Sequence, residues 1–269
     1  MKTYVVNLPK DKERRAFQEK QLQYFGIDYT FVHAVSTDDI SEQRFVQHQY
    51  DWQRPLRKVE VACYYSHRIL WKKIIETDEP ALILEDDALL SRCLPEILSY
   101  FSTVKNIDYI NLEVVGRKKL LAKKAEFLPM CHTKLYRLYL DRNGTGGYIL
   151  YPSGAQKLLD LEMKIGIGLA DAHINACTNL AAYQIEPAAV IQLDQCEKLG
   201  IIPPLEMSSN IGVQPKPVIP LKDSFYFKVK RISAQIKQAI QHVKYFFRAT
   251  KKHADIRKED FIFSKNKRG

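Results

Sequence analysis

The pattern of apolar and polar positions predicts strands alternating with helices along most of the chain. Short apolar runs rich in β-branched and aromatic residues are typical of strands, and apolar residues recurring every three or four positions are typical of helices. The predicted strands are 3–8, 29–35, 80–87, 108–113 and 144–151. The predicted helices are 10–25, 60–77 and 154–161. This alternation predicts an α/β domain with a mostly parallel sheet.

Charge divides the chain into two parts. The sequence carries 41 Lys and Arg against 31 Asp and Glu, a net charge of +10. Residues 222–269 hold 14 basic and four acidic side chains, so the whole excess lies there and residues 1–221 are neutral. Prolines crowd the segment 200–221, which marks a boundary. We therefore predict a domain at 1–221, a basic helical tail at 222–269 and no nucleic-acid partner, since the body lacks a basic excess.

The basic tail has the periodicity of an amphipathic helix. Its apolar residues recur at spacings of three and four, which puts them on one helical face, and lysines recur every seven residues on another. Such a helix is typical of proteins that lie on an anionic membrane surface. The alternative is that the stripe packs on the protein's own core or on a second subunit, as in a homodimer. The apolar positions are Val229, Ile232, Ile236, Ile240, Val243 and Phe247.

Cysteine usage and the N-terminus predict a cytoplasmic protein. The five cysteines are scattered and contain no Cys-x-x-Cys pair. We therefore expect neither a disulfide framework nor a structural zinc site, and favour a reducing compartment. The N-terminus has a short apolar run followed by charged residues, unlike a secretory signal. No stretch approaches the ~18 consecutive apolar residues of a membrane-spanning helix.

Three consecutive carboxylates end the predicted strand 80–87. In open α/β sheets, ligands bind beyond the carboxyl ends of the strands. Glu85, Asp86 and Asp87 would repel one another there unless a cation or hydrogen-bond donors neutralise them. A hard divalent ion such as Mg²⁺ or Mn²⁺, shared with a diphosphate, meets that need. The alternative is a solvated turn whose acids cap a helix.

Three further groups of residues are candidates for chemistry. Cys63 and His67 lie four apart on one helical face, where packing against the sheet is favoured over a nucleophilic pair because no oxyanion-hole motif accompanies them. Asp171 could be a general base for an acceptor hydroxyl, with His173 positioning it or completing a metal shell, or it could cap a helix. The glycines of 144–147 either allow close approach to a sugar or nucleotide or belong to a plain loop.

In their order along the chain, these motifs resemble those of glycosyltransferase family 25, the lipopolysaccharide-biosynthesis glycosyltransferases. The resemblance covers roughly residues 1–212. It departs from the family at two places, since Ala62 stands where the family usually has Gly, and Ser36-Thr37 where it has Asp-Gly. The matching motifs are Val5-Val-Asn7-Leu8 with Arg14-Arg15, Ala34-Val35, Glu60-x-x-Cys63-x-x-Ser66-His67-x-x-x-Trp71, Ala81 to Asp87, Gly144 to Leu159, Asp171-x-His173 and Ser208-Ser209-x-Ile211.

The resemblance implies a GT-A fold, in which a Rossmann-like nucleotide-binding half is joined to an acceptor half. It also implies a UDP-sugar donor held with Mn²⁺ or Mg²⁺. If the transfer inverts, one carboxylate takes the acceptor proton, and Asp171 is the first candidate and Glu113 the second. The residues expected at the nucleotide or metal are Asn7, Leu8, Arg14, Glu85, Asp86 and Asp87, with His173 as a further metal ligand.

The expected activity is transfer of a hexose, galactose before glucose, from a UDP-sugar to a lipopolysaccharide or lipooligosaccharide core acceptor. The enzyme is expected to be peripheral on the inner face of the cytoplasmic membrane. One alternative is a non-catalytic nucleotide- or glycan-binding protein of the same fold. Another is a metal-dependent phosphotransferase or hydrolase, which is disfavoured because the sequence has no phosphate-cradling motif.

Overall fold

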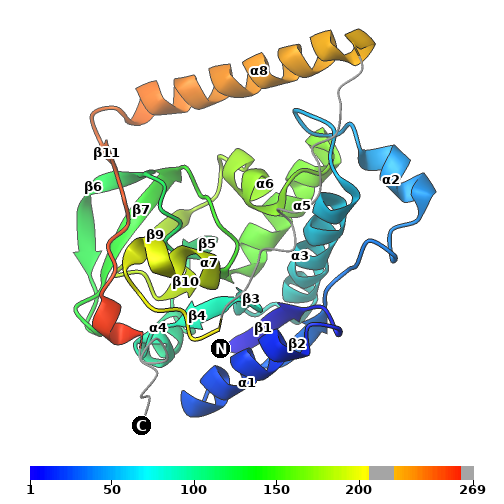
Figure 1. The fold of residues 1–269 in the computed structure, drawn as a ribbon. Helices are drawn as coiled ribbons and strands as arrows, with labels where there is room; N and C mark the ends of the chain where they lie inside the picture. The colour runs from blue at the N-terminus through cyan, green and yellow to red at the C-terminus, as the bar shows by residue number, and fades with distance from the viewer. Residues whose placement is uncertain (206–220, 262–269) are drawn as a thin grey trace.

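The computed structural model describes residues 1–205 and 221–261, and in this part of the chain a nine-stranded sheet forms the centre of the fold (Figure 1). The strands are β1 (Lys2–Asn7), β2 (Thr30–His33), β3 (Ala81–Glu85), β4 (Ala88–Leu90), β5 (Tyr109–Asn111), β6 (Lys119–Phe127), β7 (Lys134–Leu140), β8 (Gly147–Leu150), β9 (Ala182–Glu186), β10 (Val190–Gln192) and β11 (Ala249–Lys252). The order in the large sheet is β11-β6-β7-β9-β5-β8-β3-β1-β2, and β4 pairs with β10 separately.

The predicted α/β class is confirmed, and six of the nine strands of the large sheet run in the same direction, although five of its eight pairings are antiparallel. Strands β1, β2 and β3 are mutually parallel, and β5 and β9 run in the same direction as β3. Strand β8 is antiparallel to both of its neighbours, β3 and β5. Beyond β9, the strands β7, β6 and β11 continue the sheet with antiparallel pairing. The parallel half of the sheet therefore contains β3, the strand that leads into the three carboxylates.

Helices cover both faces of the sheet and bury two apolar cores. Helices α3, α5 and α6 pack on one face, and α1 and α4 on the other. In β3, Ala81 and Ile83 point into the first core while Leu82 and Leu84 point into the second. This double burial explains why β3 is an unbroken apolar run. The helices are α1 (Lys12–Tyr24), α2 (Glu42–His48), α3 (Lys58–Thr77), α4 (Leu94–Phe101), α5 (Pro152–Ile165), α6 (Ala170–Ala176), α7 (Leu193–Cys196) and α8 (Leu221–Tyr245), with short 3₁₀ turns η1 (Glu197–Leu199) and η2 (Lys258–Asp260).

The C-terminal part of the chain is a helix that leads back into the sheet. Helix α8 lies across one side of the molecule (Figure 1), and β11 then pairs with β6 at the edge of the sheet. The expectation of a separate tail at 222–269 is therefore wrong from β11 onward, because this strand belongs to the main sheet. The proline-rich boundary and the predicted Ser208-Ser209-x-Ile211 motif lie largely or wholly outside the described residues. Among the helices that are described, none is both long and apolar enough to cross a membrane.

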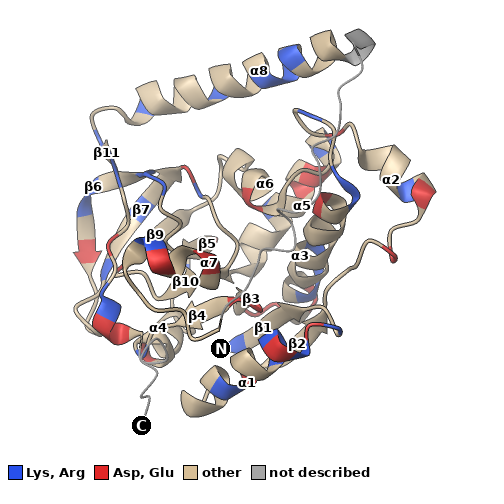
Figure 2. Cartoon of the chain, in the orientation of Figure 1, with Lys and Arg blue, Asp and Glu red and all other residues tan. Residues whose placement is uncertain are grey.

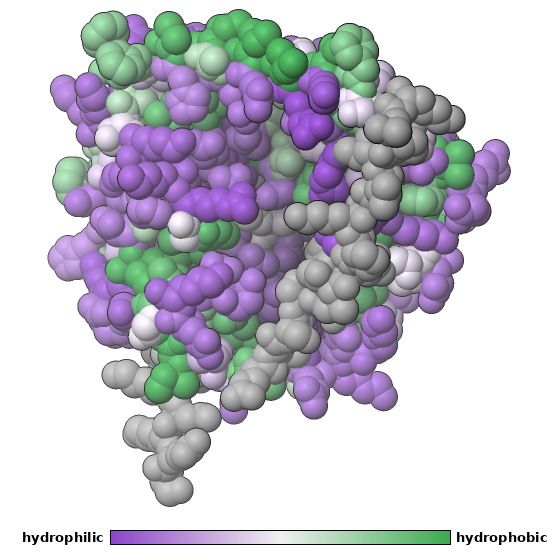
Figure 3. All heavy atoms as spheres, turned by 45° about the horizontal axis from the view of Figure 1, so that its top comes forward, coloured by the Kyte–Doolittle hydropathy of each residue, from purple (hydrophilic) through white to green (hydrophobic). Residues whose placement is uncertain are grey.

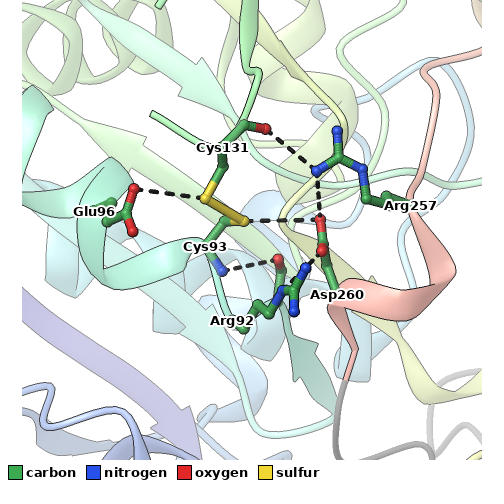
Figure 4. The surroundings of a disulfide bond; sticks show 7 residues. Arg92, Cys93, Glu96, Cys131, Arg257 and Asp260 are labelled. Carbon is green, nitrogen blue, oxygen red and sulfur yellow. Dashed lines mark hydrogen bonds and ion pairs between the residues drawn. A yellow bond between two sulfur atoms is a disulfide. The ribbon is translucent and has the colours of Figure 1, made fainter. Parts of the chain in front are cut away.

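Two cysteines form a disulfide, contrary to the expectation from their spacing. Cys93 at the start of α4 is bonded to Cys131 in the connection between β6 and β7 (Figure 4). Buried Asp260 lies beside them and accepts a hydrogen bond from Arg92 Nε at 3.0 Å, while Arg257 Nη1 lies 3.6 Å from its other oxygen. The two cysteines are 38 residues apart in the sequence and come together through the tertiary fold, so no local sequence motif predicts the bond.

Candidate active site

A cavity of about 610 Å³ opens at the edge of the sheet where β1, β2 and β3 end. Because these strands are parallel, their carboxyl ends meet at the same edge. The cavity walls come from the loops after β1 and β2, one face of α3 and the turn after β3. Its volume lies in the range of small-molecule sites. Six of the lining residues matter for the site: Leu8, Arg14, Cys63, His67, Glu85 and Asp86.

Asp86 is fixed by two residues that the sequence had placed near the nucleotide. Asn7, the last residue of β1, donates from Nδ2 to Asp86 Oδ2 at 2.8 Å, and Arg14 Nη1 on α1 lies 2.8 Å from Asp86 Oδ1. Burial raises the pKa of Asp86, although both donors oppose that effect. Asp86 therefore ties the turn after β3 to β1 and α1.

Glu85 is the most completely hydrogen-bonded of the three acids. His67 Nε2 lies 3.3 Å from Glu85 Oε1, the Thr145 hydroxyl donates to the same oxygen, and Gln192 Nε2 donates to Oε2 at 2.9 Å. Burial alone would raise the pKa of Glu85, but the hydrogen bonds and the charge of His67 outweigh it, and the pKa is lowered. His67 is itself oriented by the Tyr148 hydroxyl, 3.0 Å from Nδ1.

Asp87 has the weakest local stabilisation of its negative charge. Burial and the neighbouring charge of Glu85 raise the pKa of Asp87 to about 7. Its nearest polar contacts are long, with Arg14 Nη1 at 3.6 Å and Gln192 Nε2 at 3.4 Å. A buried carboxylate in this state gains most from an added cation.

The described residues contain no group of three or more His, Cys, Asp or Glu arranged to hold a metal ion. Glu85 and Asp86 already accept hydrogen bonds from protein donors, which leaves Asp87 as the carboxylate best suited to an ion. Hard cations of the Mg²⁺ type are often bound by one or two carboxylates together with substrate phosphates. The residues fit an ion shared with a diphosphate, and they do not fit a preformed protein cage.

Glu113 lies beneath the glycine-rich segment rather than facing solvent. Its side chain is fully buried, Oε2 accepts a hydrogen bond from Gly146 N at 2.8 Å, and Oε1 has no hydrogen-bond partner among the residues that the structure describes. Burial and the charge of Glu85 raise the pKa of Glu113 well above its ordinary value. A Cβ on Gly144, which has φ +90°, would clash with Glu113 Oε2. The absence of a side chain at these glycines therefore lets the main chain approach the Glu113 carboxyl closely.

Asp171 lies in the first turn of α6, where the main chain supports its charge. Ala172 N donates to Asp171 Oδ1 at 2.7 Å. Burial raises the pKa of Asp171, and the charge of Arg117 partly opposes this. The side chain is half-buried, in contrast to the full burial of Glu113. Of the two predicted bases, Asp171 is the more accessible carboxylate.

His173 belongs to the core and does not join the acidic cluster. Its ring is fully buried and stacked on Trp71, with 5.8 Å between ring centroids. Its Nε2 atom lies 3.0 Å from the Leu158 carbonyl and 3.3 Å from the Tyr64 hydroxyl. The expectation that His173 is a metal ligand is therefore wrong, because its ring packs between α3, α5 and α6 and lies in the core.

Two points remain, namely the reactivity of the Cys63 thiol and two site residues that the sequence analysis did not identify. Cys63 lines the cavity, but burial raises the pKa of its thiol, so it is a poor nucleophile. Thr145 and Gln192 contact Glu85, and neither was singled out as a site residue. Thr145 lies within the predicted glycine-rich segment, which was the only available signal. Gln192 comes from β10, a strand for which no prediction was made.

Comparison with known proteins identifies the same family that the sequence motifs resemble. Residues 1–174 match the model of glycosyltransferase family 25, described as LPS biosynthesis protein. The chain is 30% identical over 174 residues to the lacto-N-neotetraose biosynthesis glycosyltransferase LgtB of Neisseria meningitidis serogroup B, which covers 60% of this chain and 61% of that protein. It is 26% identical over 171 residues to human procollagen galactosyltransferase 2, covering 58% of this chain and 27% of that protein. The chain thus spans less than two thirds of either relative.

Among solved structures, the chain is similar to the inositol-1-phosphate CTP transferase from T. maritima. The TM-score is 0.38 at 14% sequence identity, and the match covers 71% of this chain and 88% of that one.

Proposed function

Because the chain belongs to glycosyltransferase family 25, we propose that it transfers a hexose from a UDP-sugar to a glycan acceptor of the lipopolysaccharide or lipooligosaccharide type. The observation that carries the proposal is the acidic turn Glu85-Asp86-Asp87 beside a cavity at the carboxyl ends of parallel strands. Galactose is the first choice of sugar and glucose the second. The choice of galactose is supported by the similarity to procollagen galactosyltransferase 2.

In the proposed donor complex, the nucleotide lies in the cavity between the end of β1 and α3. Leu8 lines that cavity, and Asn7 and Arg14 hold the acidic turn at its edge through Asp86. The Arg14 guanidinium, beside both aspartates, brings positive charge to the position proposed for the diphosphate. Glu85 contributes to the wall nearest the ribose or the metal.

The proposed metal is Mn²⁺ or Mg²⁺, held by Asp87 with Glu85 nearby and completed by the diphosphate of the donor. When bound, such an ion neutralises the negative charge that develops on the departing UDP. This arrangement agrees with the donor set described above, in which no protein cage is formed. Asp87 in particular would change from a carboxyl with a raised pKa to an ionised ligand.

Asp171 is the proposed general base. Its carboxylate would accept the proton of the acceptor hydroxyl while the acceptor oxygen bonds to the anomeric carbon and the bond from that carbon to UDP breaks. Glu113 is the weaker candidate, because its full burial raises its pKa well above the ordinary value and disfavours the ionised form that a base needs. Its proposed role is to hold the glycine-rich segment through Gly146.

An acceptor of this class is anchored in a lipid bilayer, so the proposed enzyme works at a membrane surface. We place it on the cytoplasmic face, as a peripheral protein. The similarity to LgtB, a lacto-N-neotetraose biosynthesis glycosyltransferase, supports a glycan acceptor.

The test is release of UDP from a panel of UDP-hexoses, with and without truncated lipooligosaccharide, in the presence of Mn²⁺, of Mg²⁺ or of a chelator. We expect acceptor-dependent release from UDP-galactose that requires a divalent ion. A protein that binds UDP with normal affinity but releases none from any donor would instead be a non-catalytic binding protein. Release that needs no acceptor in any condition would indicate a hydrolase.

A further inference from the structure

Helix α8 presents a continuous row of large apolar side chains to solvent. Every residue of this outer row is at least 50% exposed, and the spacings of four and three put the row on one side of the helix. In the view that brings this side forward, apolar side chains gather along α8 (Figure 3). The outer row consists of Phe225, Val229, Ile232, Ile236, Ile240 and Val243 on the helix, with Phe247 in the turn directly after its end.

The opposite side of α8 holds the helix to the protein body at both ends. Near its start, Phe227 is fully buried against Tyr50, and Lys230 Nζ donates to the Tyr50 carbonyl at 2.9 Å. At its end, Tyr245 stacks on Tyr139 of β7, with 4.0 Å between ring centroids. Turning the outer row inward would break both attachments, so the row is not an unfilled part of the core.

Beyond Asp223 in its first turn, helix α8 carries only positive charge. Residues 224–254 contain eight Lys and Arg and no Asp or Glu. At about 100° per residue, Lys228, Lys237 and Lys244 lie roughly 80–100° from the middle of the outer row and so border it. Basic residues recur along the helix in Figure 2. A second copy seated on this row would bring two such basic borders together, whereas a negatively charged surface would neutralise them.

We propose that the outer row of α8 is a docking surface for an anionic lipid bilayer. The helix would lie in the plane of the interface, with the outer row in the boundary between headgroups and acyl chains and the bordering lysines among the headgroups. Such docking would bring the enzyme to its lipid-anchored acceptor, and this role rests on the proposed function. The lipid contact itself does not depend on that function. It involves neither the cavity nor the acidic turn.

The experiment measures sedimentation of the full chain with vesicles of phosphatidylglycerol and phosphatidylethanolamine, and with vesicles of phosphatidylcholine alone. The test variant is Ile236→Ser with Ile240→Ser. The control is Gln235→Ser with Gln238→Ser, two exposed positions outside the row. Neither pair of changes alters the net charge. Truncation before α8 is unsuitable because it also removes β11 from the sheet.

We expect the wild type to bind the anionic vesicles, to bind them less at high salt and to bind phosphatidylcholine weakly. The Ile pair should lower the partition coefficient by at least about tenfold, since each isoleucine loses its transfer into an apolar environment. The Gln pair should stay within about twofold of the wild type. The circular dichroism spectrum identifies any variant that fails to fold, and Ile240→Ser alone then serves as the milder change.

The proposal is overturned if the wild type stays in the supernatant with anionic vesicles, or if the Ile pair binds as the wild type does. It is also overturned if the wild type is a dimer in the absence of lipid that the Ile pair dissociates, since the row would then be a subunit interface. UDP release on a soluble acceptor is measured in the same proteins. Its absence from all of them would contradict the proposed function and leave the lipid result unaffected.

Discussion

Replacing Asp87 by asparagine should abolish sugar transfer and stabilise the protein at the same time. Asp87 is the acid best suited to bind the proposed divalent ion, so Asn, which is uncharged, should reduce turnover below detection. In the absence of metal and donor, however, the ionised form of Asp87 lowers the free energy of unfolding. Burial and Glu85 raise the pKa of Asp87 to about 7, against an ordinary value of 3.8.

The size of the stabilisation follows from that pKa. A raised pKa means that the folded state binds the proton more tightly than the unfolded chain, so the free energy of unfolding falls as pH rises from about 4 to about 7. At 1.36 kcal/mol per unit, a difference of about three units gives at most about 4 kcal/mol above pH 7. The side chain is only 16% exposed, so solvent screening removes little of this.

The assay is urea unfolding at several pH values between 4 and 8. The free energy of unfolding of the wild type should fall across this range. That of Asp87→Asn should fall less and should be higher than that of the wild type at pH 8. Glu85→Gln is the matched contrast, because His67 and Thr145 hold the pKa of Glu85 below its ordinary value. That variant should be less stable than the wild type at neutral pH. Equal pH slopes in wild type and Asp87→Asn, or normal turnover in the variant, would refute the reasoning.

Three further predictions test the site and the disulfide. Asp171→Asn should lower turnover by roughly 10²–10⁴, the usual range for a general base, with UDP-sugar binding unchanged within a few-fold; a collapse of donor binding would instead make Asp171 a ligand of the donor. Because burial raises the pKa of Asp171, kcat should begin to fall with decreasing pH at a higher pH than an ordinary aspartate would cause, and an acidic limb at an ordinary aspartate pKa would contradict this. Cys93→Ser opens a link across 38 residues, which should lower the free energy of unfolding by about 4 kcal/mol and the Tm by roughly 7 °C in differential scanning calorimetry. The reduced wild type should match this variant, and an unchanged Tm on reduction would refute the link.

The sequence predicted the elements whose periodicity is strong. Strand β3 is an apolar run buried on both faces, and α3 has apolar residues at helical spacing over 20 residues, so both were identified close to their observed bounds. Strands β6 and β7 were not identified. Strand β6 buries only its first three residues, and the rest, which includes charged residues and the exposed Phe127, is half-buried or exposed, which is a weak strand pattern. Strand β11 was hidden for the same reason, within a segment dominated by lysine.

In the candidate site, the sequence identified the acids but not what holds them. Clustered carboxylates are visible in any sequence, whereas Gln192 reaches Glu85 only through the pairing of β10 with β4, the strand that follows the acidic turn. The error at His173 has the opposite origin. An Asp-x-His pair suggests shared chemistry, but in a helix neighbouring positions two apart point in different directions. Asp171 is therefore half-buried while His173 faces the core.

Glu113 is connected to Glu85 of the acidic turn through the glycine-rich segment. Its carboxyl accepts from Gly146 N, and the adjacent Thr145 donates to Glu85. A neutral Glu113 can hold Gly146 as well as an ionised one, so Glu113→Gln should retain turnover within about tenfold. Glu113→Ala removes the acceptor for Gly146 N and should displace Thr145, which lowers turnover through Glu85. Loss of turnover in Ala but not in Gln identifies a positioning residue, whereas an equal loss of roughly 10² or more in both would return Glu113 to the role of base.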